Sequence, residues 1–396
     1  MPTTPTQKLA KLFAKKTADV RFTHVHLDAL PDLAAASHVT KLDLGFNDLA
    51  ELPSSLGLLR DLVELKLTKN PLVALPDAIG ELAALKELDI DDTAITALPE
   101  TLGNCKELWK LWVGGVPLTA LPSGLASLTK LVSLNLSRTQ LVALPDWIGN
   151  FANLESLYAG GEELASIPGS IGKLSRLRTL ALERTSIGEL PDAMGDLSAL
   201  GNLSMMGGKL SRLPSSLKRL GALESIRLYD QPHLDWNTVI PNLPSSLTTL
   251  LLGGGEGKSI GPEIGALSAL DSLVAQSCGL TDLPEEIGRC TNLWDVNLKN
   301  NPLPAVPPAL AGVRGLRALW LDGCTQIDWN VLPPLASLTT LSLKNCGLDT
   351  LPPSLEQLSN LTTLYVDGNT IPPKAINAFR RKLPQCTVPK GRRVDD

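Results

Sequence analysis

Four histidines and six cysteines carry most of the potential for metal or nucleophilic chemistry in this chain. His24 and His26 would share one face of a strand, which is half of a metal site. No third ligand is indicated nearby, so we expect them to form a polar face of an N-terminal cap. No cysteine has the paired spacing of a zinc site or the sequence context of a catalytic nucleophile. The sequence therefore predicts no metal, no cofactor and no catalytic residue.

A glycine-rich segment ends in Gly257-Lys258-Ser259, as phosphate-binding loops do. That motif requires a glycine five positions before Gly257, where this chain has Leu252. It also requires a helix directly after the serine, whose amides point at the phosphate. Here the following residues continue a different pattern, so we expect no nucleotide and no small-molecule substrate.

Composition limits the classes of partner and compartment. The net charge of −5 gives no general attraction for nucleic acid or anionic membranes. A hydrophobic fraction of 43% with 19% charged residues is typical of a protein with a large buried core. The N-terminus lacks the apolar run of a signal peptide, no apolar stretch reaches roughly 18 residues, and the cysteines are unpaired in spacing. We expect a cytoplasmic monomer with free buried thiols and no transmembrane segment.

Any site must be positioned by a repeat that dominates the chain. The pattern is LxxLxLxxxxLxxLPxxIGxLxx, its steps are 23 residues with two exceptions of 24 and 22, and it covers about residues 39 to 371. Its fifteen starts are Val39, Leu62, Leu85, Leu108, Leu131, Leu154, Leu177, Leu200, Leu223, Leu247, Leu270, Leu293, Leu316, Leu338 and Leu361.

One repeat shows how the pattern folds. Leu134 and Leu136 alternate with polar residues and predict a short strand with both leucines turned inward. Pro145 ends any strand, and Ile148 and Phe151 return along the outer face as part of an apolar wedge. We expect Gly149 to allow a turn that a side chain would strain. Since one repeat cannot bury these residues alone, neighbours must stack into a parallel sheet.

The unit with LPxxIGxL is similar to the typical leucine-rich-repeat class of intracellular Ras-binding and plant Ras-group-related proteins, which has bacterial relatives. The resemblance implies an α/β repeat solenoid: a curved horseshoe with a parallel concave sheet and a mostly irregular or 3-10 convex face. It implies binding to proteins without specifying which one.

The chain departs from the family at the asparagine that joins neighbouring repeats. Asparagine stands there only as Asn47, Asn70, Asn301 and Asn369; other repeats have Thr93, Thr139, Thr185, Cys278, Cys324, Cys346 or less suitable residues. Threonine and cysteine can donate one hydrogen bond from the same place, so we expect a weaker ladder that still stacks. Cys105 and Cys290 replace packing leucines.

Two further irregularities overlie the repeat. The turns after successive strands alternate between charged ones, such as those ending in Thr93 and Thr139, and glycine-rich ones, such as Gly114-Gly115, which indicates a duplicated module of two repeats. Two repeats contain Asp-Trp-Asn in place of LPxxIG. Asp235 and Asp328 are expected to cap short helices over Trp236 and Trp329, with a second binding surface as the alternative.

The ends of a solenoid must shield its core. We predict an N-terminal cap at 1–38 with an amphipathic helix near residues 7–16, the repeat array at 39–371, a C-terminal cap at 372–388 and a disordered tail at 389–396. The alternative for the first helix is a basic contact with a membrane or partner. In the C-terminal cap we expect a helix over 373–383 and a last edge strand at 386–388.

Aromatic residues gather on the outward-facing strand positions, although they form only 4% of the chain. Such residues have no evident folding role there, and tryptophan, tyrosine and arginine anchor many interfaces. We predict a partner-binding site on the concave face around Trp109, Trp112 and Tyr158, bordered by acidic residues on one side and by arginines, including Arg178, on the other. The full predicted set is Trp109, Trp112, Tyr158, Asp89, Asp91, Asp92, Arg138, Arg184, Arg227, Tyr229, Trp294, Trp320 and Tyr365.

The sequence favours a non-catalytic scaffold for a protein partner, with a role in signalling through a small GTPase or kinase as the resemblance implies. A second hypothesis is a bacterial effector secreted into a host cell, because the alternating turns resemble those of plant-pathogen effectors. A third is an enzyme whose site the repeat pattern conceals.

Overall fold

The computed structural model describes residues 4–255 and 259–389. The predicted tail from residue 390 onward, the first three residues and the centre of the glycine-rich segment, Glu256 to Lys258, lie outside the described residues. The chain divides into two compact units, Met1–Ser204 and Met205–Asp396, so the division falls inside the predicted repeat array. Both units repeat one short strand and one outer turn.

The described residues of the first unit form nine strands that pair in parallel and in sequence order. Equivalent leucines lie opposite one another, as Leu88, Leu111 and Leu134 do. The strands are β1 (Asp19–Arg21), β2 (Lys41–Asp43), β3 (Glu64–Lys66), β4 (Glu87–Asp89), β5 (Lys110–Trp112), β6 (Ser133–Asn135), β7 (Ser156–Tyr158), β8 (Thr179–Ala181) and β9 (Asn202–Ser204). β1 precedes the first repeat start, so the described residues hold one strand more than the fifteen that the repeat count predicts.

In the second unit, the residues that the structure describes form seven strands with the same parallel order. They are β10 (Ser225–Tyr229), β11 (Thr249–Gly253), β12 (Ser272–Gln276), β13 (Asp295–Asn297), β14 (Ala318–Trp320), β15 (Thr340–Ser342) and β16 (Thr363–Tyr365).

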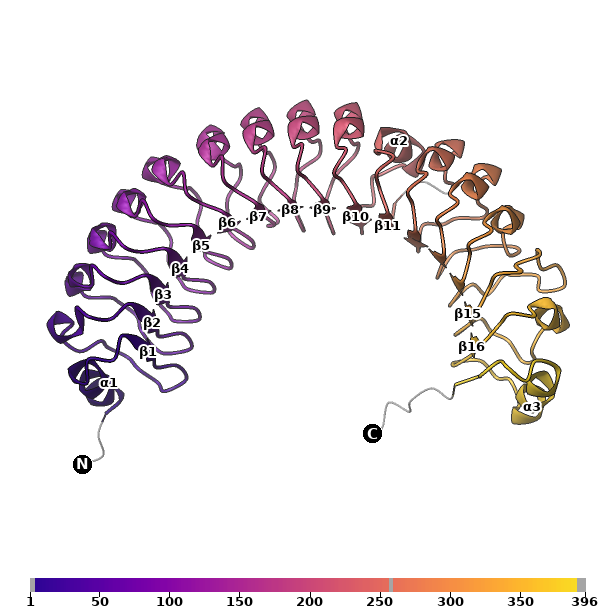
Figure 1. The fold of residues 1–396 in the computed structure, drawn as a ribbon, viewed down its shortest axis with the longest axis horizontal. Coiled ribbons are helices and arrows are strands. Elements are labelled where there is room, and N and C mark those ends of the chain that lie inside the picture. Colours follow the sequence, from indigo (N-terminus) through magenta and orange to yellow (C-terminus); the bar gives the residue numbers. More distant parts are fainter. Residues whose placement is uncertain (1–3, 256–258, 390–396) are drawn as a thin grey trace. The chain divides into compact units, whose positions relative to one another are not determined.

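Short 3-10 helices form the outer side of each unit, and the strands line the inner, concave side (Figure 1). In the first unit they are η1 (Ala34–Ala36), η2 (Ser54–Leu58), η3 (Asp77–Glu81), η4 (Glu100–Asn104), η5 (Ser123–Ser127), η6 (Asp146–Asn150), η7 (Gly169–Lys173) and η8 (Asp192–Asp196). In the second they are η9 (Ser215–Arg219), η10 (Ile240–Asn242), η11 (Pro262–Ala266), η12 (Glu285–Arg289), η13 (Pro308–Gly312) and η14 (Pro353–Gln357). The parallel sheet and 3-10 outer face confirm the predicted solenoid.

The core fills the space between strand and 3-10 helix. Leu134, Leu136, Ile148 and Phe151 are each at most 2% exposed, as the pattern predicts. The reason for Gly149 differs from the prediction. A Cβ on Gly149 would lie 2.6 Å from the carbonyl oxygen of Ser170, so the glycine permits close stacking of η6 on η7 and is not needed for a left-handed turn.

Helices close both ends. α1 (Pro5–Ala14) begins at a capping box, in which the Thr4 hydroxyl accepts from the backbone amide of Gln7, and it buries Leu9 and Phe13. α3 (Pro373–Lys382) buries Phe379. The expected final strand is reduced to a single parallel bridge between Thr363 and Thr387. None of the helices within the described ranges is long and apolar enough to cross a membrane.

One of the two Asp-Trp-Asn repeats forms the expected helix. α2 (Trp236–Val239) is capped by Asp235, whose side chain accepts from the amide of Asn237, and Trp236 is fully buried. Its backbone turn closes through the amide of Ile240, which donates to the Trp236 carbonyl.

The expected second helix, after Asp328, is wrong. Residues 328–331 form only a turn, although Asp328 still accepts from the amide of Asn330. Pro333 occupies the position equivalent to Ile240 and has no amide hydrogen to donate, so the helical turn cannot close. Trp329 is half-buried, and Val331 is 65% exposed.

The ladder between repeats is mixed, as predicted. Asn301 accepts from the amides of Cys278 and Leu280 and donates to the carbonyls of Ala275 and Leu298. The thiol of Cys324 donates to the Leu298 carbonyl at 3.3 Å.

Two threonine hydroxyls of this column bond within their own repeats: Thr93 donates to the Ile90 carbonyl and Thr139 donates to the Leu136 carbonyl. Gln231, which the sequence analysis left among the less suitable residues, bonds like asparagine to Met205 and Leu210.

Candidate functional site

His24 and His26 are exposed but do not share one face of a strand, as half of a metal site would require. His24 and His26 have left-handed backbone angles in the turn after β1, with φ of 59° and 57°. The His24 ring stacks on Phe46 at 4.3 Å, and His26 Nδ1 lies 2.9 Å from the Asp48 carboxylate. Within 4–255 and 259–389, no three histidine, cysteine, aspartate or glutamate side chains are grouped to hold a metal ion.

The strands decide which side chains face outward. In β5, Leu111 points into the core and is 1% exposed, so Lys110 and Trp112 project from the concave surface. Trp109 directly precedes β5, so it lies at the side of the sheet where the strands begin, and it is 37% exposed. Each repeat therefore offers two outward positions on the strand and one at its entrance.

Several predicted aromatic anchors have intramolecular partners, which corrects the expectation that they lack a folding role. Trp112 donates from Nε1 to the Ser133 hydroxyl at 3.1 Å, and the Nζ of Lys110 lies 3.6 Å from the centre of its ring. The N–H group and one face of this indole are thereby engaged within the first unit.

The second unit contains a comparable arrangement. Trp320 donates to the Asp295 carboxylate at 2.8 Å and stacks with Tyr365, their ring centres 6.1 Å apart. Lys299 and Lys344 lie over these two rings. Tyr229 hydrogen-bonds Gln276 through its hydroxyl. These rings stabilise contacts between repeats.

Three predicted aromatics remain available. Trp109 and Tyr158 are each 37% exposed, and Trp294 is 47% exposed. Among the residues that the structure describes, none accepts a hydrogen bond from the Trp109 indole or the Tyr158 hydroxyl. Trp109 and Tyr158 lie in the first unit, whereas Trp294 lies in the second.

The predicted acidic residues are largely engaged within the first unit. Asp89 accepts from the Thr68 hydroxyl at 2.7 Å. Asp91 accepts from the Gly114 amide and the Asn135 amide group. Burial, with the neighbouring Asp89 charge adding to it, raises the pKa of Asp91 to about 6.

Asp92 and Arg138, predicted on opposite borders of the site, form an ion pair at 2.8 Å across the intervening repeat. Gly115 lies beneath this pair with φ of 71°, and a Cβ there would lie 2.2 Å from the Asp92 carboxylate. At Gly115 the alternation of charged and glycine turns thus has a physical reason, because the Asp92 and Arg138 side chains meet over the glycine turn that separates their own turns.

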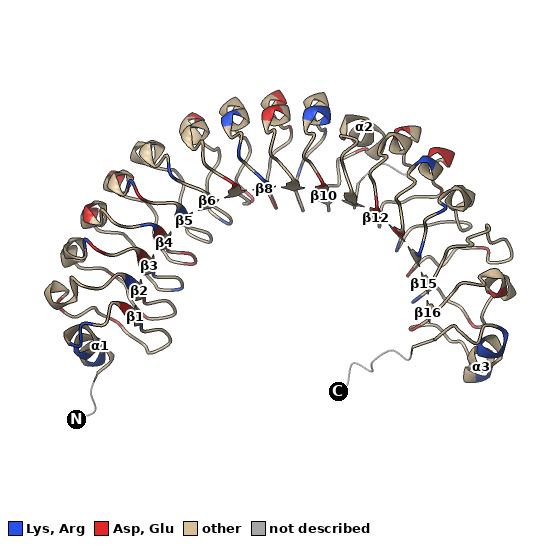
Figure 2. Cartoon of the chain, viewed as in Figure 1, with Lys and Arg blue, Asp and Glu red and all other residues tan. Residues whose placement is uncertain are grey.

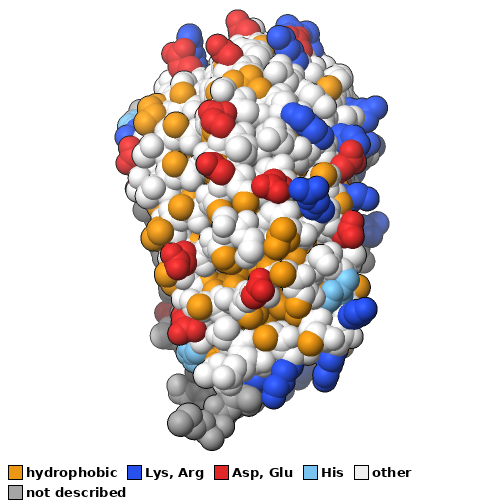
Figure 3. Space-filling model, turned by 90° about the vertical axis from the view of Figure 1, so that its left-hand side faces the viewer, with side chains coloured by type: hydrophobic (Ala, Val, Ile, Leu, Met, Phe, Trp, Pro, Cys, Tyr) orange, Lys and Arg blue, Asp and Glu red, His pale blue; other side chains and the backbone are white. Residues whose placement is uncertain are grey.

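The predicted arginines differ in their surroundings. Arg178 lies 3.7 Å from Glu155, and Arg184 and Arg227 are exposed. Charged residues of both signs occur along the strands and turns of the first unit (Figure 2). On the face in Figure 3, lysine and arginine gather along one margin, while aspartate and glutamate are scattered.

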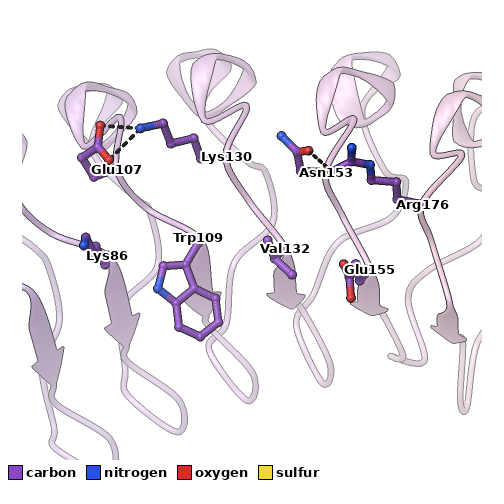
Figure 4. Close-up of a pocket in the computed structure, with 8 residues that line it drawn as sticks. All are labelled: Lys86, Glu107, Trp109, Lys130, Val132, Asn153, Glu155 and Arg176. Carbon is purple, nitrogen blue, oxygen red and sulfur yellow. Dashed lines mark hydrogen bonds and ion pairs between the residues drawn. The ribbon is translucent and has the colours of Figure 1, made fainter.

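Trp109 projects into a shallow groove of about 410 Å³ at the edge of the sheet, which we call the Trp109 groove (Figure 4). It crosses the entrances to strands in five consecutive repeats, all in the first unit. Its lining residues are Lys86, Glu107, Trp109, Lys130, Val132, Asn153, Glu155 and Arg176.

Sequence reasoning found Trp109 but missed its neighbours. Lys86, Val132 and Glu155 occupy the same repeat position as Trp109, and Glu107, Lys130, Asn153 and Arg176 lie two residues earlier in their repeats. Comparing these two positions through the repeats would have revealed the groove. The structure thus offers an exposed aromatic surface with charged borders, which suits binding more than bond-breaking chemistry.

Comparisons with known proteins agree with this fold. A family model described as Leucine Rich Repeat matches residues 337–358. A leucine-rich-repeat protein from Leptospira interrogans is 25% identical, with 96% of this chain and 98% of that chain covered and a TM-score of 0.70. An internalin from Listeria monocytogenes is 20% identical, with 98% and 96% covered and a TM-score of 0.60.

The leucine-rich-repeat ectodomain of a plant membrane receptor kinase from Arabidopsis thaliana, solved in complex with Casparian strip integrity factor 2, is 21% identical. The match covers 91% of this chain and 48% of that chain, with a TM-score of 0.54. No curated protein matches the sequence. The repeat, the parallel sheet with its 3-10 outer face and these similarities together show that the chain has a leucine-rich-repeat solenoid fold.

Proposed function

We propose that the chain is a non-catalytic scaffold that binds a protein partner on the concave surface of its first unit, through Trp109 and Tyr158. The observation that carries this proposal is the exposure of both rings, 37% each, on a surface whose other tryptophan, Trp112, is held by its own neighbours. Large aromatic side chains that a fold leaves uncovered are frequent centres of binding energy.

The similar proteins support binding as the general role. The plant receptor ectodomain was solved in complex with Casparian strip integrity factor 2, which supports a binding role for this fold. The six described cysteines are free and buried, which is in keeping with the reducing compartment that we propose for this protein.

The test is affinity capture from lysate with the wild-type chain and the Trp109→Ala, Tyr158→Ala double variant. Leu58→Ala is the control, because Leu58 is a 48% exposed apolar residue on η2, on the outer side of the same unit. We expect one protein to be retained by wild type and control and lost by the double variant, with all three chains melting alike.

Equal capture by the double variant would contradict the site. A small GTPase or a kinase among the specifically captured proteins would support the signalling role that the sequence resemblance implies.

A further inference from the structure

The charges of the Trp109 groove do not balance. Lys130 lies 2.6 Å from both carboxylate oxygens of Glu107, so this pair is internally neutralised. Glu155 faces Arg178, which lies 3.7 Å away in the next repeat. Both carboxylates of the groove therefore have a cationic partner.

Two cations remain at opposite ends of the groove. Lys130 lowers the pKa of Glu107 by its hydrogen bond and charge, and the charge of Lys86 adds to this, but the Nζ of Lys86 forms no hydrogen bond or ion pair with any described residue. Among the described residues, Arg176 hydrogen-bonds only the neutral Asn153, at 2.7 Å. Figure 4 shows Lys86 at one end and Arg176 at the other, with Trp109 and Val132 between them. Together with Arg178, the groove carries four cations against two carboxylates, although the whole chain is negative.

The length of the groove fits an extended segment. Lys86 and Arg176 belong to repeats that are four strand steps apart, which corresponds to roughly 19 Å at about 4.8 Å per step. An extended chain covers that distance with about six residues. Such a segment would place an apolar side chain on Trp109 and Val132 and an acidic side chain near each end.

We propose that the Trp109 groove binds an extended acidic segment of a protein partner, with a large apolar residue flanked by aspartate or glutamate. This inference rests on the proposed function and specifies the partner's chemistry. A nucleic acid fits less well, because its regularly spaced phosphates would lie against Glu107 and Glu155, which interrupt the row of cations.

The experiment measures fluorescence anisotropy of labelled synthetic peptides of equal length with the full chain. The acidic peptide contains Asp-Glu-Leu-Phe-Glu-Asp, the basic peptide Lys-Arg-Leu-Phe-Arg-Lys, and the third peptide keeps the acids around Gly-Ser. We expect the acidic apolar peptide to bind at least about tenfold more tightly than either of the others. Trp109→Ala should remove most of that preference.

Charge variants separate recognition from damage to the fold. Lys86→Gln with Arg176→Gln should weaken the acidic peptide about tenfold, whereas the matched Lys173→Gln, on the outer helix η7, should leave it unchanged. Glu107→Gln frees Lys130 and should tighten binding a few fold, which a misfolded chain would not do.

Failure of the inference and failure of the proposed function give different results. Equal binding of acidic and basic peptides, no effect of the Lys86 and Arg176 changes, or stronger binding of a labelled single-stranded oligonucleotide would overturn the acidic segment. If a captured partner still depends on Trp109 and Tyr158, the proposed function survives such a result. If partner capture does not depend on Trp109 and Tyr158 either, the proposed function and the acidic-segment inference are both contradicted.

Discussion

At the scale of single residues, the left-handed turn at Gly115 sets a narrow limit on substitution, because the Asp92 carboxylate occupies the place of a side chain there. Gly115→Ala should lower the free energy of unfolding by about 2 kcal/mol, because an alanine at φ of 71° is strained and its Cβ displaces the Asp92 carboxylate. Gly169→Ala is the control: its Cβ would meet no atom within 4 Å, and the change should be within about 0.5 kcal/mol. Urea unfolding measures both, and equal effects would contradict the role of Gly115.

Asp91 makes stability depend on pH. Its pKa is raised from 3.8 to about 6, so between these values the folded chain holds a proton that the unfolded chain has released. The stabilising contribution is full below this range and is lost as the pH rises through about 6.

Asp91→Asn should therefore be more stable than wild type at pH 7, and the difference should shrink toward pH 4. The partly exposed carboxylate is screened by solvent, so we expect a gain of about 1 kcal/mol. Thermal unfolding across this pH range checks it, and a constant difference would argue against titration of Asp91.

At the scale of elements, the ladder residues are unequal in the contacts that they supply. Asn301→Ala removes four hydrogen bonds to buried backbone groups and should cost about 3 kcal/mol. Thr139→Ala removes one hydrogen bond, to Leu136, and should cost about 1 kcal/mol. Chemical denaturation of the two variants gives the comparison, and similar losses would show that the ladder is not the main stabilising contact.

The sequence predicted strands and core well because both depend on the period of apolar residues, as at Leu134 and Ile148. The prediction of a helix after Asp328 failed because Pro333 lacks the backbone amide hydrogen that would close the helical turn, which the period of apolar residues does not reveal. The sequence located Trp109 but not the groove, because the groove is formed by side chains whose neighbours are 23 residues apart. Ser133 and Lys110 likewise contact Trp112 because of the length and direction of their side chains, and the repeat pattern gives neither of these.

At the scale of the molecule, all six cysteines are buried. Burial raises the pKa of every one of these thiols, for example that of Cys278 to about 12 and that of Cys105 to about 11. We expect the native chain to react very slowly with a disulfide reagent at pH 8 and all six thiols to react after unfolding. Fast labelling of one thiol in the native chain would show that its repeat opens locally.

The ion pair over Gly115 also bears on how such a chain can gain or lose length. Asp92 and Arg138 are 46 positions apart, and the turn between them must lack a side chain. Deleting a single repeat there would place two charged turns next to each other, with no glycine turn between them over which their side chains could meet. In this part of the first unit, recombination or design that changes the number of repeats by two therefore keeps the contact between Asp92 and Arg138 intact.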